Sequence, residues 1–333
     1  MKAFAINKYS KKENLHLVDL SVPQFNNNDV LVEVHAAGVN LLDSKIKSGE
    51  FKLILPYKLP LILGHDVAGV VVKTGKNVTK FKVGDEVYAR PSDHRIGTFA
   101  EFIAIDEKDT ALKPKNLSME EAASIPLVAL TAWQALVEKG QIKTGDKVFI
   151  QAGSGGVGTI AIQLAKYLGA KVATTASPKS FGVLKNLGAD IVIDYKNSDF
   201  EGQLSNYDLV INSQDKKTLE KSVNILKAGG KLISISGPPT PDFAKEIGAS
   251  WLIKSILSLL SSGIRKKAKA KNVNYSFLFM RAEGDQLGEI TKLIEAGIIK
   301  PVIDKIFPFN ETNEALAYVE GGRAKGKIVI KIK

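Results

Sequence analysis

The sequence has no cysteine, no long apolar run and few aromatic residues, and these absences exclude several classes of protein. Without cysteine the chain cannot form disulfides, thiolate nucleophiles or cysteine-bound metal sites. No apolar stretch approaches the roughly 20 residues of a transmembrane helix. The N-terminal segment also lacks the apolar core of about 7–15 residues that a signal peptide needs. We therefore expect a cytoplasmic protein that does not span a membrane.

Positive charge is abundant but scattered, with one dense run. The formal net charge is +11, and only Arg265–Lys271 concentrates it. Because this run lacks interleaved aromatic residues, it favours a solvated surface or loop, and we expect no nucleic-acid partner. The preceding segment, 251–264, is apolar but interrupted by Lys254 and several serines. It predicts a helix whose apolar face packs in the core or against a partner.

The length and the pattern of apolar residues predict two domains. A chain of 333 residues is long for one core. Up to about residue 110, short β-like runs alternate with turns, which predicts a β-rich, barrel-like domain. A helix N-terminal signal follows at Ser118, and helical spacing continues toward Gly140. The β-like runs are 29–39, 66–75, 83–89 and 97–106.

Beyond residue 140, strands and helices alternate. The intervals between the strands are too long for hairpins, so the pattern predicts βαβ crossovers and a parallel sheet covered on both faces. The last segments, from about 282 onward, are predicted to return to the first domain. We therefore place the first domain at 1–122 and 282–333, and the second at 123–281. The predicted strands of the second domain are 147–152, 171–177, 190–195, 207–213, 231–237 and 272–280.

A glycine-rich turn gives the clearest functional signal. Gly153, Ser154, Gly155, Gly156, Val157 and Gly158 form a G-x-G-x-x-G pattern between a predicted strand and a predicted helix. The first glycine permits a tight turn, the second lets backbone amides approach a pyrophosphate, and the third allows close packing of helix on strand. The helix N-terminus adds partial positive charge. The pattern predicts a dinucleotide site.

The end of the next strand discriminates between dinucleotides. An NAD site usually offers an acidic residue about 20 residues after the turn, for the ribose 2′-hydroxyl. Here the segment 174–180 has hydroxyls and Lys179, and no acid occurs before Asp190. Because a carboxylate repels a 2′-phosphate and a lysine attracts it, the sequence favours NADPH over NADH. The alternative is that Lys179 only begins a surface helix.

Several motifs along nearly the whole chain, including LGHDVAG (63–69), AGSGGVG (152–158) and GGRAKGKIV (321–329), carry a family resemblance. Together they resemble the medium-chain dehydrogenase/reductase superfamily, and within it the zinc-free quinone oxidoreductase and enone reductase branch. The resemblance implies a GroES-like β-barrel catalytic domain, a Rossmann domain, an active site in the cleft between them, and a homodimer. The other motifs are 36–43, 83–89, 97–102, 122–136 and 188–195.

The same resemblance raises the question of a metal. Zinc-dependent members have a cysteine near the position of Asn40, a histidine at that of His65, and a further thiolate. Here His65 is followed by Asp66, and there is no cysteine. One histidine and one aspartate do not make three fixed ligands around an open position. We therefore expect no metal, and expect His65 to be a hydrogen-bonded residue.

Without zinc, hydrogen-bond donors would have to carry the charge that develops on a conjugated carbonyl during reduction. The resemblance places Asn40 as a polar orienting group, Lys45 as a donor to the oxyanion, and Tyr57 as a pocket residue or proton relay. Lys45 could instead be solvated, and Tyr57 could be a packed loop aromatic.

The resemblance also implies cofactor contacts outside the glycine turn. Thr131 would lie near the nicotinamide, and Ser236 and Gly237 near its ribose. Ser177, Lys179 and Tyr195 would surround the 2′-phosphate. Phe277, Phe279 and Lys325 match segments that close over the cofactor, although an interface strand and a solvated tail explain them nearly as well.

These inferences predict an NADPH-dependent, zinc-independent oxidoreductase that reduces quinones, or the C=C bond of α,β-unsaturated carbonyls, by hydride transfer. The substrate would be a small molecule. Two alternatives remain at this point: an enoyl-thioester reductase, and a non-catalytic NADPH- and RNA-binding protein of the same fold.

Overall fold

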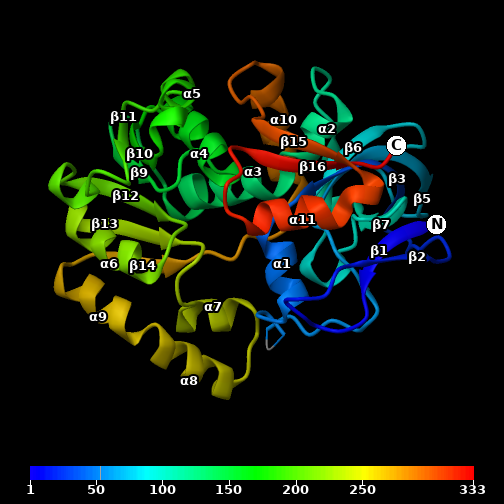
Figure 1. The fold of residues 1–333 in the computed structure, drawn as a ribbon, viewed down its shortest axis with the longest axis horizontal. Coiled ribbons are helices and arrows are strands. Elements are labelled where there is room, and N and C mark those ends of the chain that lie inside the picture. Colours follow the sequence, from blue (N-terminus) through cyan, green and yellow to red (C-terminus); the bar gives the residue numbers. More distant parts are fainter. Residues whose placement is uncertain (53) are drawn as a thin grey trace. The chain divides into compact units, whose positions relative to one another are not determined.

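The computed structural model describes residues 1–52 and 54–333, and the chain divides into two compact units (Figure 1). The first unit contains Met1–Leu130 and Arg281–Lys333, and the second contains Thr131–Met280. Both ends of the chain therefore belong to the first unit.

The first unit is built on a seven-stranded sheet, with a separate three-stranded sheet of order β2-β1-β4. The larger sheet has the order β15-β16-β3-β5-β6-β8, and β7 pairs with β3. The C-terminal strand β16 pairs antiparallel with β3, so the tail joins this sheet as the sequence predicts. The strands are β1 (Lys2–Ile6), β2 (His16–Asp19), β3 (Asp29–Val39), β4 (Leu61–Ile62), β5 (Asp66–Thr74), β6 (Glu86–Ala89), β7 (Phe102–Asp106), β8 (Thr110–Leu112), β15 (Ile303–Pro308) and β16 (Lys327–Lys331).

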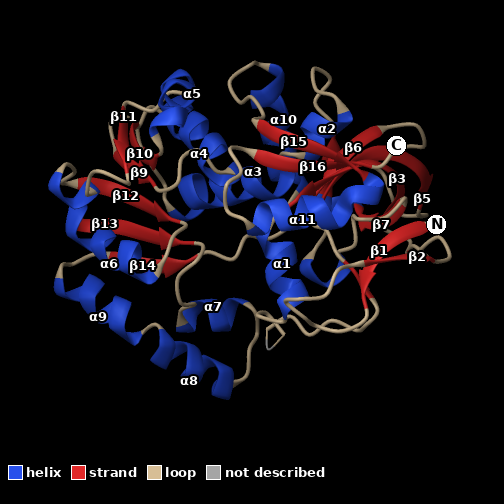
Figure 2. Ribbon diagram, in the orientation of Figure 1, coloured by secondary structure: helices blue, strands red, loops and turns tan. Residues whose placement is uncertain are grey.

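Helices of the first unit cover these sheets (Figure 2). Buried valines and isoleucines of β3, β5, β6 and β7 form one core cluster, and residues of β1, α11 and β16 form another. Such alternation of buried apolar residues is what places a strand against a core. The helices are α1 (Leu41–Ser48), α2 (Met119–Ala123), α10 (Gly284–Glu295) and α11 (Thr312–Glu320), with 3-10 turns at Asp93–Arg95, Glu107–Asp109 and Phe309–Glu311.

The prediction of a helix from Ser118 toward Gly140 is correct for its start but wrong for its continuity. Ser118 accepts a hydrogen bond from the Glu121 amide, as a capping box requires. The helix then ends at Ala123 and restarts as α3 (Pro126–Trp133), because a proline disfavours helical geometry in the residue before it. A π-helical segment, Gln134–Lys139, follows.

The second unit is a six-stranded parallel sheet of order β11-β10-β9-β12-β13-β14. In chain order this is 3-2-1-4-5-6, the order of a dinucleotide-binding sheet, with its switch point between β9 and β12. Figure 1 shows α4 and α5 on one face and α6 and α9 on the other. The strands are β9 (Lys147–Ile150), β10 (Lys171–Ala176), β11 (Ile191–Asp194), β12 (Tyr207–Asn212), β13 (Leu226–Ser234) and β14 (Asn274–Phe277).

The second unit has six α-helices among the described residues, and the sequence predicted the helical form of α8 but not the exposure of its apolar face. They are α4 (Gly156–Tyr167), α5 (Phe181–Asn186), α6 (Lys216–Ile225), α7 (Pro241–Glu246), α8 (Trp251–Leu260) and α9 (Ser262–Ala270), with 3-10 turns at Pro178–Ser180 and Phe200–Gly202. The apolar segment from Trp251 is helical as predicted, but its apolar face does not pack in the core. No helix in the described part of the chain is long and apolar enough to cross a bilayer.

Candidate active site

The glycine turn lies at the switch point of the parallel sheet, directly after β9. The main chain of Gly153 packs against β10, because a Cβ there would lie 2.2 Å from Thr174 Oγ1. A Cβ on Gly158 would lie 2.5 Å from the Ala152 carbonyl oxygen, so this glycine permits the contact of helix and turn. Among the described residues, a Cβ on Gly155 would meet only that same oxygen within 4 Å, at 3.4 Å. The protein's own packing therefore explains two of the three glycines and not the third.

The first turn of α4 places backbone donors beside Gly155. Gly155 is the N-cap and has no side chain to accept a hydrogen bond from the helix amides. The first amides of any helix lack intrahelical acceptors, so those of Gly156 and Val157 are the kind of donors that bind an anion at a helix N-terminus. Ala152 has a φ of +51°, a left-handed conformation that is uncommon for a residue with a side chain. The turn is thus held in an uncommon conformation next to the first amides of α4.

Three predicted 2′-phosphate residues follow the ends of two neighbouring strands. β10 and β11 pair in parallel with Ala176 opposite Asp194, so Ser177 and Tyr195 continue from adjacent strand ends. Lys179 follows in the turn after β10, is exposed, and has no ion pair among the described residues. The hydroxyl of Ser180, which lies in the same turn, is buried and has no hydrogen-bond partner among the described residues. Ser180 lies within the hydroxyl-bearing segment 174–180 that the sequence singled out, although it was not named as a contact of the 2′-phosphate.

A chain of hydrogen bonds, buried at Gln151, Asn212 and Ser234, positions the Ser236–Gly237 segment. Asn212 Nδ2 donates to Gln151 Oε1 at 2.6 Å, and Ser234 Oγ donates to Asn212 Oδ1 at 2.6 Å. Ser234 Oγ in turn accepts the Gly237 amide at 2.7 Å, and Ser236 Oγ donates to the Gln214 carbonyl oxygen at 2.6 Å. The chain links the ends of β9, β12 and β13. Ser236 and Gly237 were predicted from the sequence, whereas Gln151, Asn212 and Ser234 were missed, although a polar residue at the end of two apolar strands was a usable signal.

The other predicted cofactor residues have mixed surroundings. Thr131 is buried in α3. Phe277 and Phe279 both contact Phe243 of α7, with ring centroids 5.1 and 5.8 Å apart, so they contribute to packing within the second unit. Lys325 lies in the first unit, in the exposed turn before β16, where its amide donates to Asp304 Oδ2.

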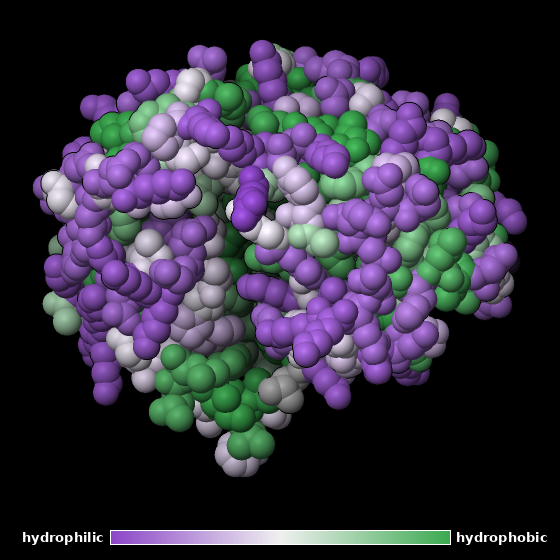
Figure 3. All heavy atoms as spheres, in the orientation of Figure 1, coloured by the Kyte–Doolittle hydropathy of each residue, from purple (hydrophilic) through white to green (hydrophobic). Residues whose placement is uncertain are grey.

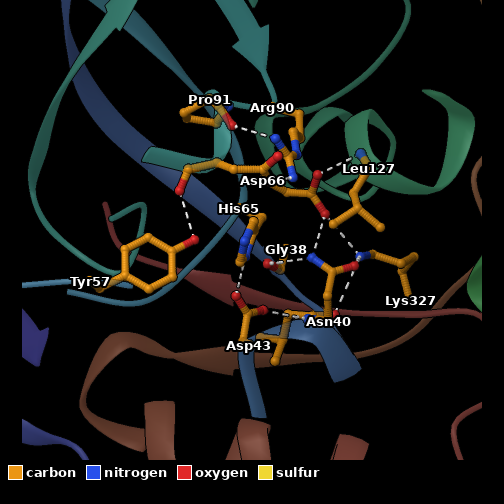
Figure 4. Close-up of polar contacts among 12 residues, drawn as sticks. Gly38, Asn40, Asp43, Tyr57, His65, Asp66, Arg90, Pro91, Leu127 and Lys327 are labelled. Atoms are coloured by element: carbon orange, nitrogen blue, oxygen red, sulfur yellow. Dashed lines mark hydrogen bonds and ion pairs between the residues drawn. The ribbon is translucent and has the colours of Figure 1, made fainter. Parts of the chain in front are cut away.

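In the first unit, the buried ammonium of Lys327 lies close to Asn40 and Asp66 (Figure 4). Lys327 Nζ donates to Asp66 Oδ2 at 2.9 Å, to Asn40 Oδ1 at 2.5 Å and to the Val39 carbonyl oxygen at 3.3 Å. Asn40 Nδ2 donates to Asp66 Oδ2 at 2.9 Å, and the Leu127 amide donates to Asp66 Oδ1 at 2.6 Å. Each charge is therefore compensated by several short contacts, as a buried ion pair requires.

Asp43 and His65 form a second buried pair beside this one. His65 Nδ1 lies 2.6 Å from Asp43 Oδ1, while Asp43 Oδ2 accepts the Asn40 amide at 2.8 Å. This confirms that His65 is hydrogen-bonded. Its Nε2 is buried without a partner among the described residues. Asp43 therefore orients both the histidine ring and the start of α1.

This donor set does not suit zinc. The carboxylate of Asp66 is already used by an ammonium, an amide side chain and a backbone amide, and the chain has no thiolate. Zinc sites require three or four fixed nitrogen, sulfur or oxygen ligands. The described residues contain no cluster of three or more histidine, cysteine, aspartate or glutamate residues that could hold a metal.

Lys45 and Tyr57, the other two predicted catalytic residues, differ in their hydrogen bonding. Lys45 is half-buried on α1 and its ammonium has no partner among the described residues, whereas Lys47 is paired with Glu320 at 3.2 Å. Tyr57 Oη donates to the Asp93 carbonyl oxygen at 2.7 Å, and burial raises the pKa of the Tyr57 phenol. The buried Arg90 guanidinium binds the Asp93 carboxylate and so fixes the acceptor of Tyr57.

Known proteins resemble this chain over its whole length. Residues 26–115 match the alcohol dehydrogenase GroES-like domain, and residues 187–330 match the zinc-binding dehydrogenase family. A mitochondrial NAD(P)H oxidoreductase of Homo sapiens is 36% identical, with 100% of this chain and 89% of that protein covered. A chloroplastic NADPH-dependent alkenal/one oxidoreductase of Arabidopsis thaliana is 35% identical, with coverages of 99% and 79%.

A solved structure agrees with these relatives. The quinone oxidoreductase from Coxiella burnetii has a TM-score of 0.87 and 32% identity, and the similarity covers 100% of this chain and 99% of that one. The GroES-like domain and the parallel Rossmann-type sheet expected from the sequence are thus confirmed. The chain belongs to the medium-chain dehydrogenase/reductase superfamily, among its relatives of the quinone oxidoreductase and alkenal/one reductase type.

Proposed function

We propose that the protein is an NADPH-dependent, zinc-independent reductase of quinones or of the C=C bond of α,β-unsaturated carbonyls. One observation supports this most strongly. Gly155 stands at an uncapped helix N-terminus where the packing of the protein does not require a glycine. A residue without a side chain at that point suits the approach of a pyrophosphate.

The residues of the second unit fit an NADPH molecule. The amides of Gly156 and Val157 would bind the pyrophosphate, and Lys179 with Ser177 and Tyr195 would bind the 2′-phosphate. The ammonium of Lys179, which has no ion pair among the described residues, and the absence of an acid at the end of β10 support NADPH over NADH. The buried chain from Gln151 to Ser234 would hold the Ser236–Gly237 segment against the nicotinamide ribose. When bound, NADPH supplies the hydride.

On the substrate side we propose that Lys45 donates a hydrogen bond to the carbonyl oxygen. Its ammonium has no partner among the described residues, so binding a developing oxyanion would break no existing ion pair. Asn40 is engaged by Asp66 and Lys327, and would act by holding the start of α1. Tyr57 would line the pocket with a neutral phenol.

The direct test is NADPH oxidation, followed by its near-ultraviolet absorbance, with p-benzoquinone, phenanthrenequinone, trans-alkenals and methyl vinyl ketone. We expect turnover with at least one of these acceptors and a lower Kd for NADPH than for NADH by calorimetry. K179Q should raise the Kd for NADPH about tenfold and leave that for NADH unchanged, because one charge-assisted contact is lost. Protein that binds neither dinucleotide would refute the proposal.

The role of Lys45 has its own test. K45M should lower kcat/KM for the preferred acceptor by about a hundredfold, the order expected for loss of one oxyanion donor, without changing the Kd for NADPH. K52M is the matched control, since Lys52 is exposed and its ammonium lies 5.5 Å from the ring of Tyr9. Equal kinetics of the two variants would show that Lys45 is merely solvated.

A further inference from the structure

Helix α8 exposes an apolar face, which is the reverse of an ordinary surface helix. Trp251 and Leu259 are 78% and 76% exposed, and Leu252, Ile256 and Leu260 are also exposed. We call these five residues the apolar face of α8. The residues turned toward the protein include Leu257, which is buried, and the partly buried Lys254. A helix that is apolar on its outer side normally packs against another surface.

A strongly basic segment follows this face along the chain. Residues 247–273 contain one arginine, five lysines and no acidic residue. Lys266, Lys269 and Lys271 of this segment are exposed and have no ion pair among the described residues. We call these three residues the lysine run.

The apolar and basic surfaces lie side by side. Ser261 is the C-cap of α8 and also the N-cap of α9, and its helical backbone joins the two helices. Arg265 reaches back to donate to the Ser258 carbonyl oxygen at 2.9 Å, which ties α9 to α8. Figure 3 shows the apolar patch over α8, with hydrophilic side chains beside it over α9 on the same face of the molecule.

We propose that α8 and α9 form a docking surface for an anionic lipid bilayer. The apolar face of α8 would enter the boundary between headgroups and acyl chains, and the lysine run would contact the acidic headgroups. Helices that lie in the plane of a bilayer combine an apolar face that includes tryptophan with adjacent lysines, and need not be long enough to span it. Clustered lysines add attraction to acidic lipids that is screened by salt.

The charges favour this occupant over a second copy of the chain. A symmetric contact through α8 would bring two basic segments together, and 247–273 offers no acid to compensate them. The acids beside this segment are already paired: Glu220 of α6 is 3.8 Å from Lys267 and 3.9 Å from Lys216, and Glu246 of α7 is 3.3 Å from Lys139. A bilayer rich in acidic lipid supplies the missing negative charge.

The test uses the full chain and flotation with lipid vesicles. We expect the protein to float with vesicles of phosphatidylcholine and phosphatidylserine, not with phosphatidylcholine alone, and to be released by added salt. K266Q/K269Q/K271Q should weaken partitioning about a hundredfold, given the contribution per lysine near an acidic surface. W251S/L259S should weaken it at least tenfold, because apolar area is lost.

Two controls separate the surface from general effects. K185Q/K196Q/K217Q removes the same charge from exposed lysines elsewhere in the second unit and should leave partitioning nearly unchanged. Tryptophan emission should shift to shorter wavelength on vesicle binding, and W251F should abolish the shift, since Trp133 is the only other tryptophan. Far-UV circular dichroism verifies that each variant is folded.

Several results of these experiments would contradict a bilayer-docking role for α8 and α9. Failure to bind either vesicle, or equal binding to both, would overturn the proposal. So would an equal loss of binding in K185Q/K196Q/K217Q and K266Q/K269Q/K271Q, which would point to net charge alone. If W251S/L259S instead dissociates a dimer in sedimentation and does not alter flotation, the face is an interface between copies. None of these results depends on the proposed reductase activity.

Discussion

Among single residues, Lys327 is one whose loss should be strongly destabilising. Its ammonium is the buried partner of Asp66, and removing one member of such a pair leaves the other charge uncompensated. We predict that K327M lowers the free energy of unfolding by about 3–5 kcal/mol, measured by denaturant titration. K331M is the matched control, because Lys331 is exposed in its pair with Glu120 and should cost less than about 1 kcal/mol.

The double variant D66N/K327M refines this prediction. Removing both charges leaves no isolated ion, so the double variant should be less destabilised than the sum of the single variants. Purely additive losses would show that Asp66 and Lys327 are not coupled.

Tyr57 predicts a dependence of stability on alkaline pH. Burial raises its pKa above the value of about 10 expected in the unfolded chain, so the folded state holds the phenolic proton more tightly. The resulting stabilisation is fully present below about pH 10 and is lost as the pH rises above that value. Y57F should therefore unfold with a shallower loss of stability between neutral and alkaline pH than wild type. Y167F, at an exposed tyrosine, should follow wild type.

At the scale of elements, the strand–turn–helix unit around Gly155 separates packing from binding. We predict that G153A and G158A destabilise the unloaded protein, because a Cβ would lie within 2.5 Å of Thr174 Oγ1 or the Ala152 oxygen. G155A should change the free energy of unfolding by no more than about 1 kcal/mol and yet weaken NADPH binding at least tenfold. Denaturant titration and calorimetry measure the two effects. Unaltered NADPH binding by G155A would place the pyrophosphate elsewhere.

The elements also show what sequence reasoning could and could not reach. The strand Asp29–Val39 and the helix from Gly156 were predictable within a residue or two, because their periodicity and flanking glycines are local signals. The pairing of Lys327 with Asp66 was not, since it joins positions far apart in the chain through the sheet pairing of β16 with β3. Whether an apolar helix face is covered depends on its neighbours, so the exposure of Trp251 was equally out of reach.

At the scale of the whole molecule, the first unit needs both chain ends and the second is one continuous segment. β16 lies between β15 and β3, so the first unit is complete only when the C-terminal residues have joined the sheet. Both tryptophans, Trp133 and Trp251, belong to the second unit. Tryptophan fluorescence therefore reports the unfolding of the second unit, whereas far-UV circular dichroism reports both.

Because both tryptophans belong to the second unit, fluorescence and circular dichroism can distinguish how the two units respond to denaturant. In K327M, the dichroism transition should begin at lower denaturant concentration than the fluorescence transition, because only the first unit loses its ion pair. NADPH at a hundred times its Kd should raise the stability seen by fluorescence by about 2.7 kcal/mol, since ligand binding stabilises the unit that carries the site. Coincident transitions in K327M, shifted together by NADPH, would instead mean that the two units unfold as one cooperative body.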